Sequence, residues 1–284
     1  MNPLKWPDGK RSAASVTFDI DADSLIRTAR PDDADLRLQP ISMGRYGPTV
    51  AVPRILETYR RLELTQTFFM PAWVMKTYPA TVEVILKDGH EIGHHSWMHE
   101  DPMDHSDAQE AELFERALEV HISMTGRKPR GYRAPVYSIT PAMVNRLIEH
   151  EFHYDSSMMA DDLPYLVETP KGSLIEIPPH WGNDDWPPFA HFAEIDYLMP
   201  VRAPSDGVRA FAEEFEAMHE AGGFWMPVLH PFLTGRLARW WEMEKLIERA
   251  LENGDVWFAP VEKIAAHAAA QRNDLRRETI ETSF

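Results

Sequence analysis

Short apolar runs alternate with longer amphipathic stretches along most of the chain. The apolar runs predict strands at residues 15–18, 64–70, 91–94, 130–134, 152–156, 173–177, 224–229 and 256–258. Apolar positions at helical spacing predict helices at 53–62, 79–86, 106–124, 140–150, 205–220, 237–252 and 261–271. A strand–helix alternation of this regularity is typical of an α/β fold with a parallel sheet.

Cap residues support several of these helix boundaries. Ser106, with Gln109 three residues later, has the spacing of a capping box, and Thr140 precedes Pro141 at the start of another helix. Gly89 follows the helix at 79–86 as a C-cap.

Two stretches interrupt the alternation. Residues 23–49 are expected to form a long polar connection, and residues 178–192 are rich in proline and aromatic side chains. Loops of this length in a compact domain are usually functional or interfacial. The tail at 273–284 is expected to pack poorly.

Composition narrows the class of protein. A length of 284 residues suits one large domain, so we expect a single catalytic domain over 1–284. The net charge of −16 argues against binding to nucleic acid or anionic membranes, and the absence of cysteine excludes disulfides and thiolate metal sites. Without an apolar signal segment or a membrane-length run, the expected location is the cytoplasm.

Histidines cluster in one short segment. Four of the thirteen lie between His90 and His99. With Asp21, the pair His95 and His99 supplies the two imidazoles and one carboxylate of an open hydrolytic metal site. The alternative is a pair of hydrogen-bonded structural imidazoles. His94 could replace His95 as a ligand, but the four-residue spacing, one helical turn, favours His95.

Every polar cluster follows a predicted strand. The clusters are Asp19 with Asp21, His95 with His99, Arg133, and His230. In a parallel α/β barrel the carboxyl ends of the strands share one face, which holds the active site. We therefore expect these residues to converge on one centre.

Each remaining polar residue has a functional and a structural interpretation. On extended backbone Asp19 points the same way as Asp21, so one can bind metal while the other takes a proton; the alternative is an acidic loop or cap. Arg133 could orient a carboxylate bidentately or form a surface salt bridge. His230 is a candidate general acid or a structural histidine. The aromatic residues are either core or interface residues, or they form a wall of the substrate site. They are Trp97, Trp181, Trp186 and Phe189.

These motifs resemble those of the polysaccharide deacetylase family, carbohydrate esterase family four, over roughly residues 15–260. The family's Thr-Phe-Asp-Asp-Gly is similar to residues 17–21, and Gly-His-Glu-Ile-Gly matches residues 89–93. His-Ser-x-x-His follows at 95–99, Arg-x-Pro at 133–135, and a leucine–histidine pair at 229–230.

The resemblance implies a distorted (β/α) barrel with fewer than eight parallel strands. It also implies one divalent metal, with zinc the expected ion. The implied roles are Asp19 as base, Arg133 orienting Asp19, His230 as acid, and Asp21, His95 and His99 as metal ligands.

The first motif departs from the family pattern, because Ile20 separates the two aspartates and the glycine is missing. Asp-x-Asp is similar to a branch with intracellular peptidoglycan-deacetylase-like proteins, metal-free allantoinases and cyclic imide hydrolases. Members of that branch often form tetramers, which implies a homo-oligomer.

The leading hypothesis is metal-dependent hydrolysis of non-peptide C–N bonds. Ring opening of cyclic amides or imides, with or without metal, is the first alternative. A non-haem iron oxygenase and an inactive binding protein are less favoured, because the chain lacks a run of antiparallel strands and keeps the full polar set. The aromatic 178–192 stretch could close over the site, so we expect a small amide, a cyclic imide or an acetamido sugar rather than a polymer.

Overall fold

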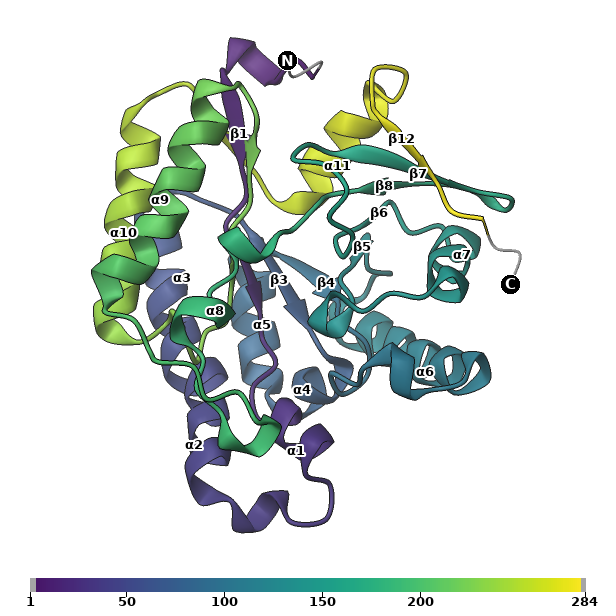
Figure 1. Cartoon of the computed structure of the whole chain (residues 1–284), viewed down its shortest axis with the longest axis vertical. Coiled ribbons are helices and arrows are strands. Elements are labelled where there is room, and N and C mark those ends of the chain that lie inside the picture. Colours follow the sequence, from purple (N-terminus) through teal and green to yellow (C-terminus); the bar gives the residue numbers. More distant parts are fainter. Residues whose placement is uncertain (1–3, 282–284) are drawn as a thin grey trace.

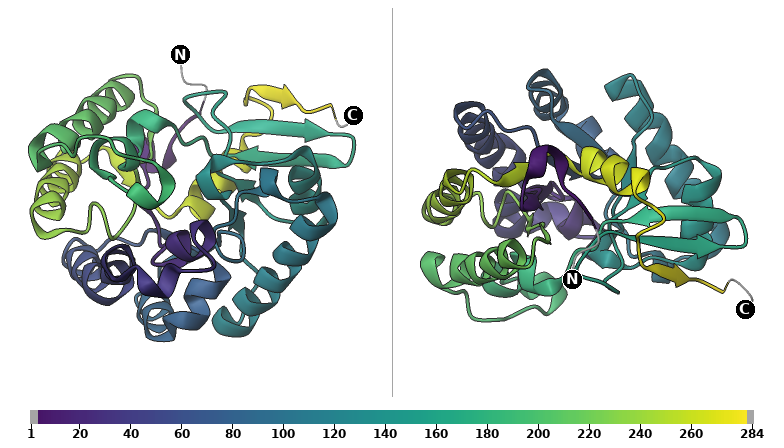
Figure 2. Two further views of the ribbon diagram at one scale, coloured as in Figure 1. Left: turned by 60° about the horizontal axis from the view of Figure 1, so that its bottom comes forward. Right: turned by 90° about the horizontal axis from the view of Figure 1, so that it is seen from above.

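A curled parallel sheet ringed by helices forms the centre of the molecule (Figures 1 and 2). The computed structural model describes residues 4–281. Seven neighbouring strands of the larger sheet run parallel, in the order β10-β2-β3-β4-β5-β6-β8. Their bounds are β2 Thr17–Asp19, β3 Thr67–Met70, β4 Glu91–His94, β5 Gly131–Tyr132, β6 Tyr154–Asp155, β8 Gly172–Glu176 and β10 Val228–Leu229.

The curled sheet is not a closed eight-stranded barrel. No ladder joins β10 to β8 among residues 4–281; Val228 of β10 instead forms an isolated bridge with Asp184, in the connection that follows β8. Beyond β8 the sheet continues with β7 (Tyr165–Thr169), which is antiparallel, and β12 (Arg277–Thr279). A small sheet of β11 (Val256–Phe258), β1 (Ser12–Ala14) and β9 (Phe224–Trp225) completes the strands. The predicted distorted barrel is confirmed.

The predicted long helices are present. They are α3 (Val52–Arg61), α5 (Pro79–Lys87), α6 (Asp107–Thr125), α7 (Pro141–Glu149), α9 (Pro204–Glu220), α10 (Leu237–Glu252) and α11 (Val261–Ala270). The Ser106–Gln109 capping box forms, the Thr140 hydroxyl accepts a hydrogen bond from the Met143 N–H, and Gly89 has φ +80°. None of the described helices is both long and apolar enough to cross a membrane.

Several sequence-based boundaries were wrong. Residues 23–49 are not a plain connection: they contain α1 (Ser24–Ala29), α2 (Leu38–Tyr46) and a π-helical turn that leads into α3. The run at 224–229 splits into β9 and β10, because Pro227 has no N–H to continue a ladder. The tail is not loose, since Leu275 is buried and β12 pairs with β7; residues 282–284 lie outside the described chain.

Strand alternation decides which side chains reach the barrel interior. Phe18 points outward, where its ring stacks on Phe68 at 5.7 Å and meets Trp240 of α10. Asp19, the next residue, lines an interior cavity. Burial of each such ring contributes about 2–3 kcal/mol, so the apolar face of β2 fixes where the carboxylate of Asp19 lies.

A buried carboxyl group closes the opposite end of β4. Glu91 accepts hydrogen bonds from the Thr67 hydroxyl at 2.6 Å, the Tyr154 hydroxyl at 2.9 Å and the Glu262 N–H at 2.9 Å, in the first turn of α11. Burial, helped by the charge of Glu262, raises the pKa of Glu91 to about 7 against the pull of these hydrogen bonds.

This shift predicts a pH-dependent free energy of unfolding. Because the folded-state pKa exceeds the ordinary glutamate value of 4.5, the native state holds the proton more tightly, and the stabilisation is complete below about pH 4.5. As pH rises to about 7 the free energy of unfolding should fall by up to roughly 3 kcal/mol. Urea unfolding at several pH values measures this change in the free energy of unfolding. Glu91→Gln should remove the fall between pH 4.5 and 7, whereas Glu119→Gln, at an exposed position, should keep it. An unchanged pH profile in Glu91→Gln would rule out this source.

Candidate active site

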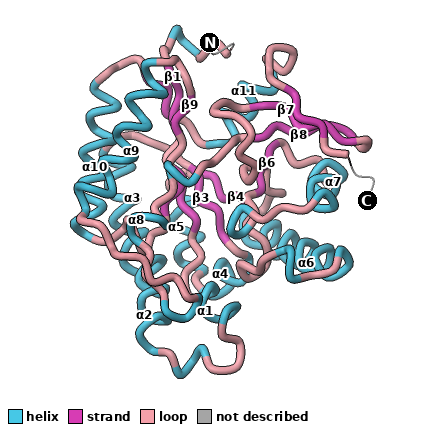
Figure 3. The backbone as a smooth tube through the Cα atoms, viewed as in Figure 1, coloured by secondary structure: helices cyan, strands magenta, loops and turns pink. Residues whose placement is uncertain are grey.

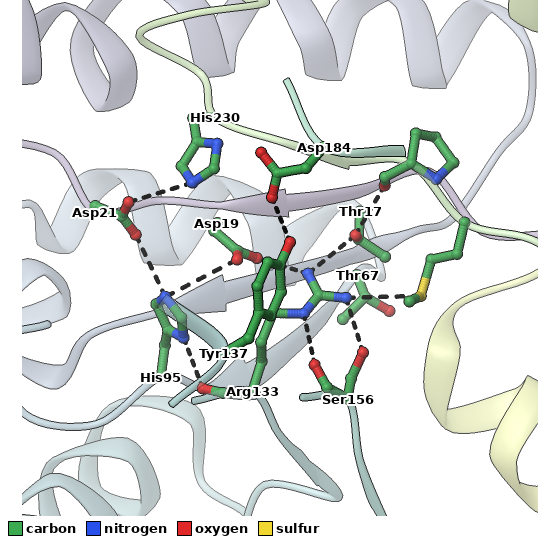
Figure 4. A network of polar contacts seen from close by, with 12 residues as sticks. Thr17, Asp19, Asp21, Thr67, His95, Arg133, Tyr137, Ser156, Asp184 and His230 are labelled. Carbon is green, nitrogen blue, oxygen red and sulfur yellow. Dashed lines mark hydrogen bonds and ion pairs between the residues drawn. The ribbon is translucent and has the colours of Figure 1, made fainter. Parts of the chain in front are cut away.

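The predicted polar residues converge at the carboxyl ends of the parallel strands. Figure 4 shows all of them except His99. All of them except Arg133 line a cavity of about 140 Å³. Five residues of the predicted polar set line it together with three aromatic side chains: Asp19, Asp21, His95, His99, His230, Tyr137, Trp181 and Trp186. The long connection between β8 and α9, seen mostly as loop in Figure 3, supplies both tryptophans.

Asp21, His95 and His99 form a buried cluster. Nε2 of His95 lies 3.4 Å from Asp21 Oδ1, and Nε2 of His99 lies 3.5 Å from Asp21 Oδ2. One donor atom from each residue falls within 4.8 Å of the others. Burial would raise the pKa of Asp21, but the imidazoles of His99, His95 and His230 outweigh it and hold that pKa far below its usual range.

The donor set of this cluster fits a divalent cation. Both Asp21 carboxylate oxygens and His95 Nε2 are buried without a hydrogen-bond partner among residues 4–281. Buried polar atoms are normally satisfied, and separations of 3.4–3.5 Å are long for hydrogen bonds. Two imidazoles and a carboxylate are ligands typical of zinc, with room for water.

Local geometry selects His95 over His94. His95 Nδ1 donates to the Arg133 carbonyl at 2.7 Å, which leaves the Nε2 lone pair facing Asp21. The His94 ring lies outside the cavity, packed against Phe114 at 5.0 Å, and its Nδ1 accepts the Ser96 N–H.

The spacing argument used to choose His95 was wrong, because residues 95–100 form a turn and not a helix. Ser96 and His99 both have positive φ, at +63° and +64°. The Glu100 carboxylate holds this turn by accepting from the Ser96 hydroxyl and from the N–H groups of Trp97 and Met98. Glu100 therefore positions His99, a role the sequence did not reveal.

Arg133 fixes Asp19 beside the cluster. Its Nη1 contacts Asp19 Oδ1 at 2.7 Å, while Oδ2 lies 3.9 Å from His95 Nε2. The contact is single and not bidentate as predicted, because the other guanidinium N–H groups bond to Ser156 and Thr17. The guanidinium is fully buried and lies 4.1 Å from the centre of the Phe69 ring.

His230 faces the cluster from β10. Its Nε2 lies 3.5 Å from Asp21 Oδ2, and its Nδ1 is 2.6 Å from Asp185 Oδ1. Burial would lower the pKa of His230, but Asp185, with smaller contributions from Asp21 and Asp184, raises it to about 10. Asp185 also accepts the N–H groups of His230 and Thr234. The sequence analysis missed Asp185, although two adjacent carboxylates in the proline- and aromatic-rich stretch were a visible signal.

A second polar pair on the cavity wall was also missed. The Tyr137 hydroxyl donates to one oxygen of Asp184. The other oxygen accepts a hydrogen bond from the backbone N–H of Trp186 at 2.6 Å. Burial raises the pKa of Asp184 to about 6. Val136 and Tyr137 both have positive φ, at +49° and +58°, a strain of about 1–3 kcal/mol for each residue.

The four predicted wall aromatics divide into two pairs. Trp181, half exposed, and Trp186 line the cavity, and Trp186 lies 5.5 Å from the His230 ring. Trp97 does not: it packs under the Arg116 guanidinium and borders a separate surface hollow of about 690 Å³. That hollow is not lined by Asp21, His95 or His99. Phe189 is a core residue, held between Gly207 of α9 and Arg239. For these two side chains the core interpretation is correct.

Comparisons with known proteins agree with the geometry. The family model for polysaccharide deacetylase matches residues 46–154. A Helicobacter pylori peptidoglycan deacetylase is 24% identical over 276 residues, covering 88% of this chain and 94% of its own. The structure of an allantoinase, 23% identical, has a TM-score of 0.79 over 95% of this chain and 94% of its own, a likeness of fold alone.

A Mycobacterium smegmatis structure described as a polysaccharide deacetylase is more similar. It is 34% identical, with a TM-score of 0.93, over 100% of this chain and 98% of its own length. With identity at this level along the full length, on the same fold, the chain belongs to the polysaccharide deacetylase family.

Proposed function

We propose that this protein is a divalent-metal-dependent hydrolase of C–N bonds other than peptide bonds, acting on small amides. One observation carries the proposal: the buried Asp21 oxygens and His95 Nε2 face His99 without hydrogen-bond partners in the described chain. Asp21, His95 and His99 would hold the ion, with zinc expected. When bound, such an ion polarises an amide carbonyl and acidifies a water molecule.

Asp19 is the proposed general base. Its Oδ1 is fixed by Arg133, which leaves Oδ2 facing the ligand cluster 3.9 Å from His95 Nε2. A carboxylate held in this position accepts the proton of the attacking water as the carbon–oxygen bond forms. Arg133 supports the negative charge of Asp19 and keeps this side chain from turning toward the cluster as a fourth ligand.

His230 is the proposed general acid. Asp185 binds Nδ1, so the proton available for transfer is the one on Nε2, which faces the cavity. The raised pKa keeps His230 protonated at neutral pH, and the same carboxylate stabilises the imidazolium until the leaving nitrogen takes the proton. Collapse of the tetrahedral intermediate then breaks the C–N bond and releases an amine and a carboxylate.

Ring opening of a cyclic imide is the second candidate, because the same groups would serve it. The cavity of about 140 Å³ supports a compact substrate, and Trp181, Trp186 and Tyr137 form aromatic walls around it. A single acetamido sugar is the larger alternative within the same chemistry.

Turnover on small and polymeric substrates tests this proposal. We expect hydrolysis of small acetamides or cyclic imides and no activity on polymeric chitin or peptidoglycan. Trp181→Ala should lower kcat/KM on the small substrate about 5- to 30-fold, since it removes an aromatic wall contact. Trp241→Ala, at a similarly exposed tryptophan on α10 outside the cavity, should not. Efficient deacetylation of polymer, with no small substrate hydrolysed, would contradict the proposal.

A further inference from the structure

The cavity wall beside His230 carries a polar pair to which the proposed chemistry gives no role. Asp184 is 2% exposed and accepts hydrogen bonds from the Tyr137 hydroxyl and the Trp186 N–H. One of its oxygens and one nitrogen of His230 lie within 4.8 Å of each other. The pair therefore lies next to the position that the leaving nitrogen would occupy.

The backbone is strained to build this pair. Val136 and Tyr137 adopt consecutive left-handed conformations, which are uncommon for residues other than glycine and an outlier for a β-branched one. The turn is held by hydrogen bonds from the Tyr137 N–H to the Ala134 carbonyl and from the Ser138 N–H to the Pro135 carbonyl. Its result is visible in Figure 4, where the phenol points to Asp184. Such strain persists where the surrounding structure enforces it, and it clusters at functional sites.

Asp184 retains acceptor capacity on the cavity side. An ionised carboxylate accepts about four hydrogen bonds, and the described chain supplies donors for two. A carboxylate cannot itself donate, and the lining of the same cavity also includes the apolar side chains of Ile195 and Leu25. A substrate that places only CH groups there would leave buried acceptor positions unsatisfied.

We infer that Asp184, held in place by Tyr137, selects substrates with an N–H or O–H group two or three bonds from the scissile nitrogen, on the leaving-group side. The inference rests on the proposed function, which places the leaving group of the substrate beside His230. One Asp184 oxygen and one His230 nitrogen lie within 4.8 Å of each other. With hydrogen bonds near 3 Å, both atoms can therefore contact neighbouring groups of the same ligand. Ureide rings and acetamido sugars with an adjacent hydroxyl have this donor, whereas plain imides and amides do not.

Two ligand pairs, each differing by one donor, test the inference by calorimetric binding to the metal-loaded protein. Hydantoin carries N–H where succinimide carries CH2, and N-acetylglucosamine carries a hydroxyl that its 3-deoxy analogue lacks. In at least one pair the wild type should bind the donor-bearing member about 10- to 100-fold more tightly, as expected for a hydrogen bond to a charged group. The pair that shows the preference identifies the ring or sugar source of the donor.

Variants separate this role from a structural one. Asp184→Asn should reduce the preference to about threefold or less, and Tyr137→Phe should weaken it, while affinity for the donor-free member stays within about twofold. Asp161→Asn is the matched control, since Asp161 also accepts the N–H two residues ahead but lies outside the cavity; Tyr165→Phe is its tyrosine counterpart. Tyr137→Phe provides the readout if Asp184→Asn fails to fold.

Equal binding within both pairs by the wild type, or no binding of any member, would overturn the inference. A preference unchanged in the folded variants would do the same. Turnover is scored separately: a donor preference without hydrolysis of any of the ligands would contradict the proposed function and leave the recognition role standing.

Discussion

Asp19→Asn and His230→Ala are each expected to keep the metal and to lose about two to four orders of magnitude in turnover. Asn at position 19 can still accept from Arg133 but cannot take a proton from water. Ala at position 230 removes the imidazole that joins the cluster to Asp185. Steady-state kinetics on metal-loaded protein, with metal content measured on the same samples, checks both.

A control substitution separates the loss of proton transfer from a general loss of structure. Asp88→Asn alters another carboxylate paired with an arginine, Arg60, outside the cavity, and should leave turnover near normal. Near-normal turnover in Asp19→Asn or His230→Ala would refute the role assigned to that residue. Loss of metal from Asp19→Asn would instead make Asp19 a ligand.

The parts of the fold that follow from strong local patterns were predictable. Helix α10 has the predicted bounds, and α6 starts at the predicted capping box, because both depend on contacts within one segment. Strand β12 was missed because it pairs with β7, which lies far from it in the sequence. Strand β7 was also missed, although its antiparallel partner β8 follows it after a tight turn. Helices α1 and α2 were hidden in a polar stretch whose amphipathic signal is weak.

The polar centre was predictable for a topological reason. Asp19 ends a strand, and Asp21, His95, Arg133 and His230 each come just after one. Parallel strands bring their carboxyl ends to one face. Strand alternation then separates His94 from His95, which the spacing to His99 alone did not justify.

The residues that support this centre come from irregular segments and escaped prediction. Asp184 and Asp185 lie between two short helical turns, and Tyr137 depends on two left-handed residues that no periodicity reveals. Residue type alone also misled for Trp97 and Phe189, because an aromatic side chain serves a core and a cavity wall equally well.

Removal of a proposed metal ligand is the second change with a large expected effect. Asp21→Ala, His95→Ala and His99→Ala should each lower metal occupancy sharply, since three protein ligands leave no redundancy. His105→Ala is the control, because His105 is partly exposed and borders the separate hollow beside Trp97. Activity should fall in parallel with occupancy in the three ligand variants and stay near normal in the control.

Elemental analysis of the purified wild type and of His99→Ala, after equilibration with zinc and removal of free ion, tests the central claim most directly. The proposed site predicts close to one divalent ion per wild-type chain and a small fraction of that in His99→Ala, with the control His105→Ala matching the wild type. Full occupancy in His99→Ala, or no bound ion in the wild type, would contradict the assignment of Asp21, His95 and His99 as a metal site.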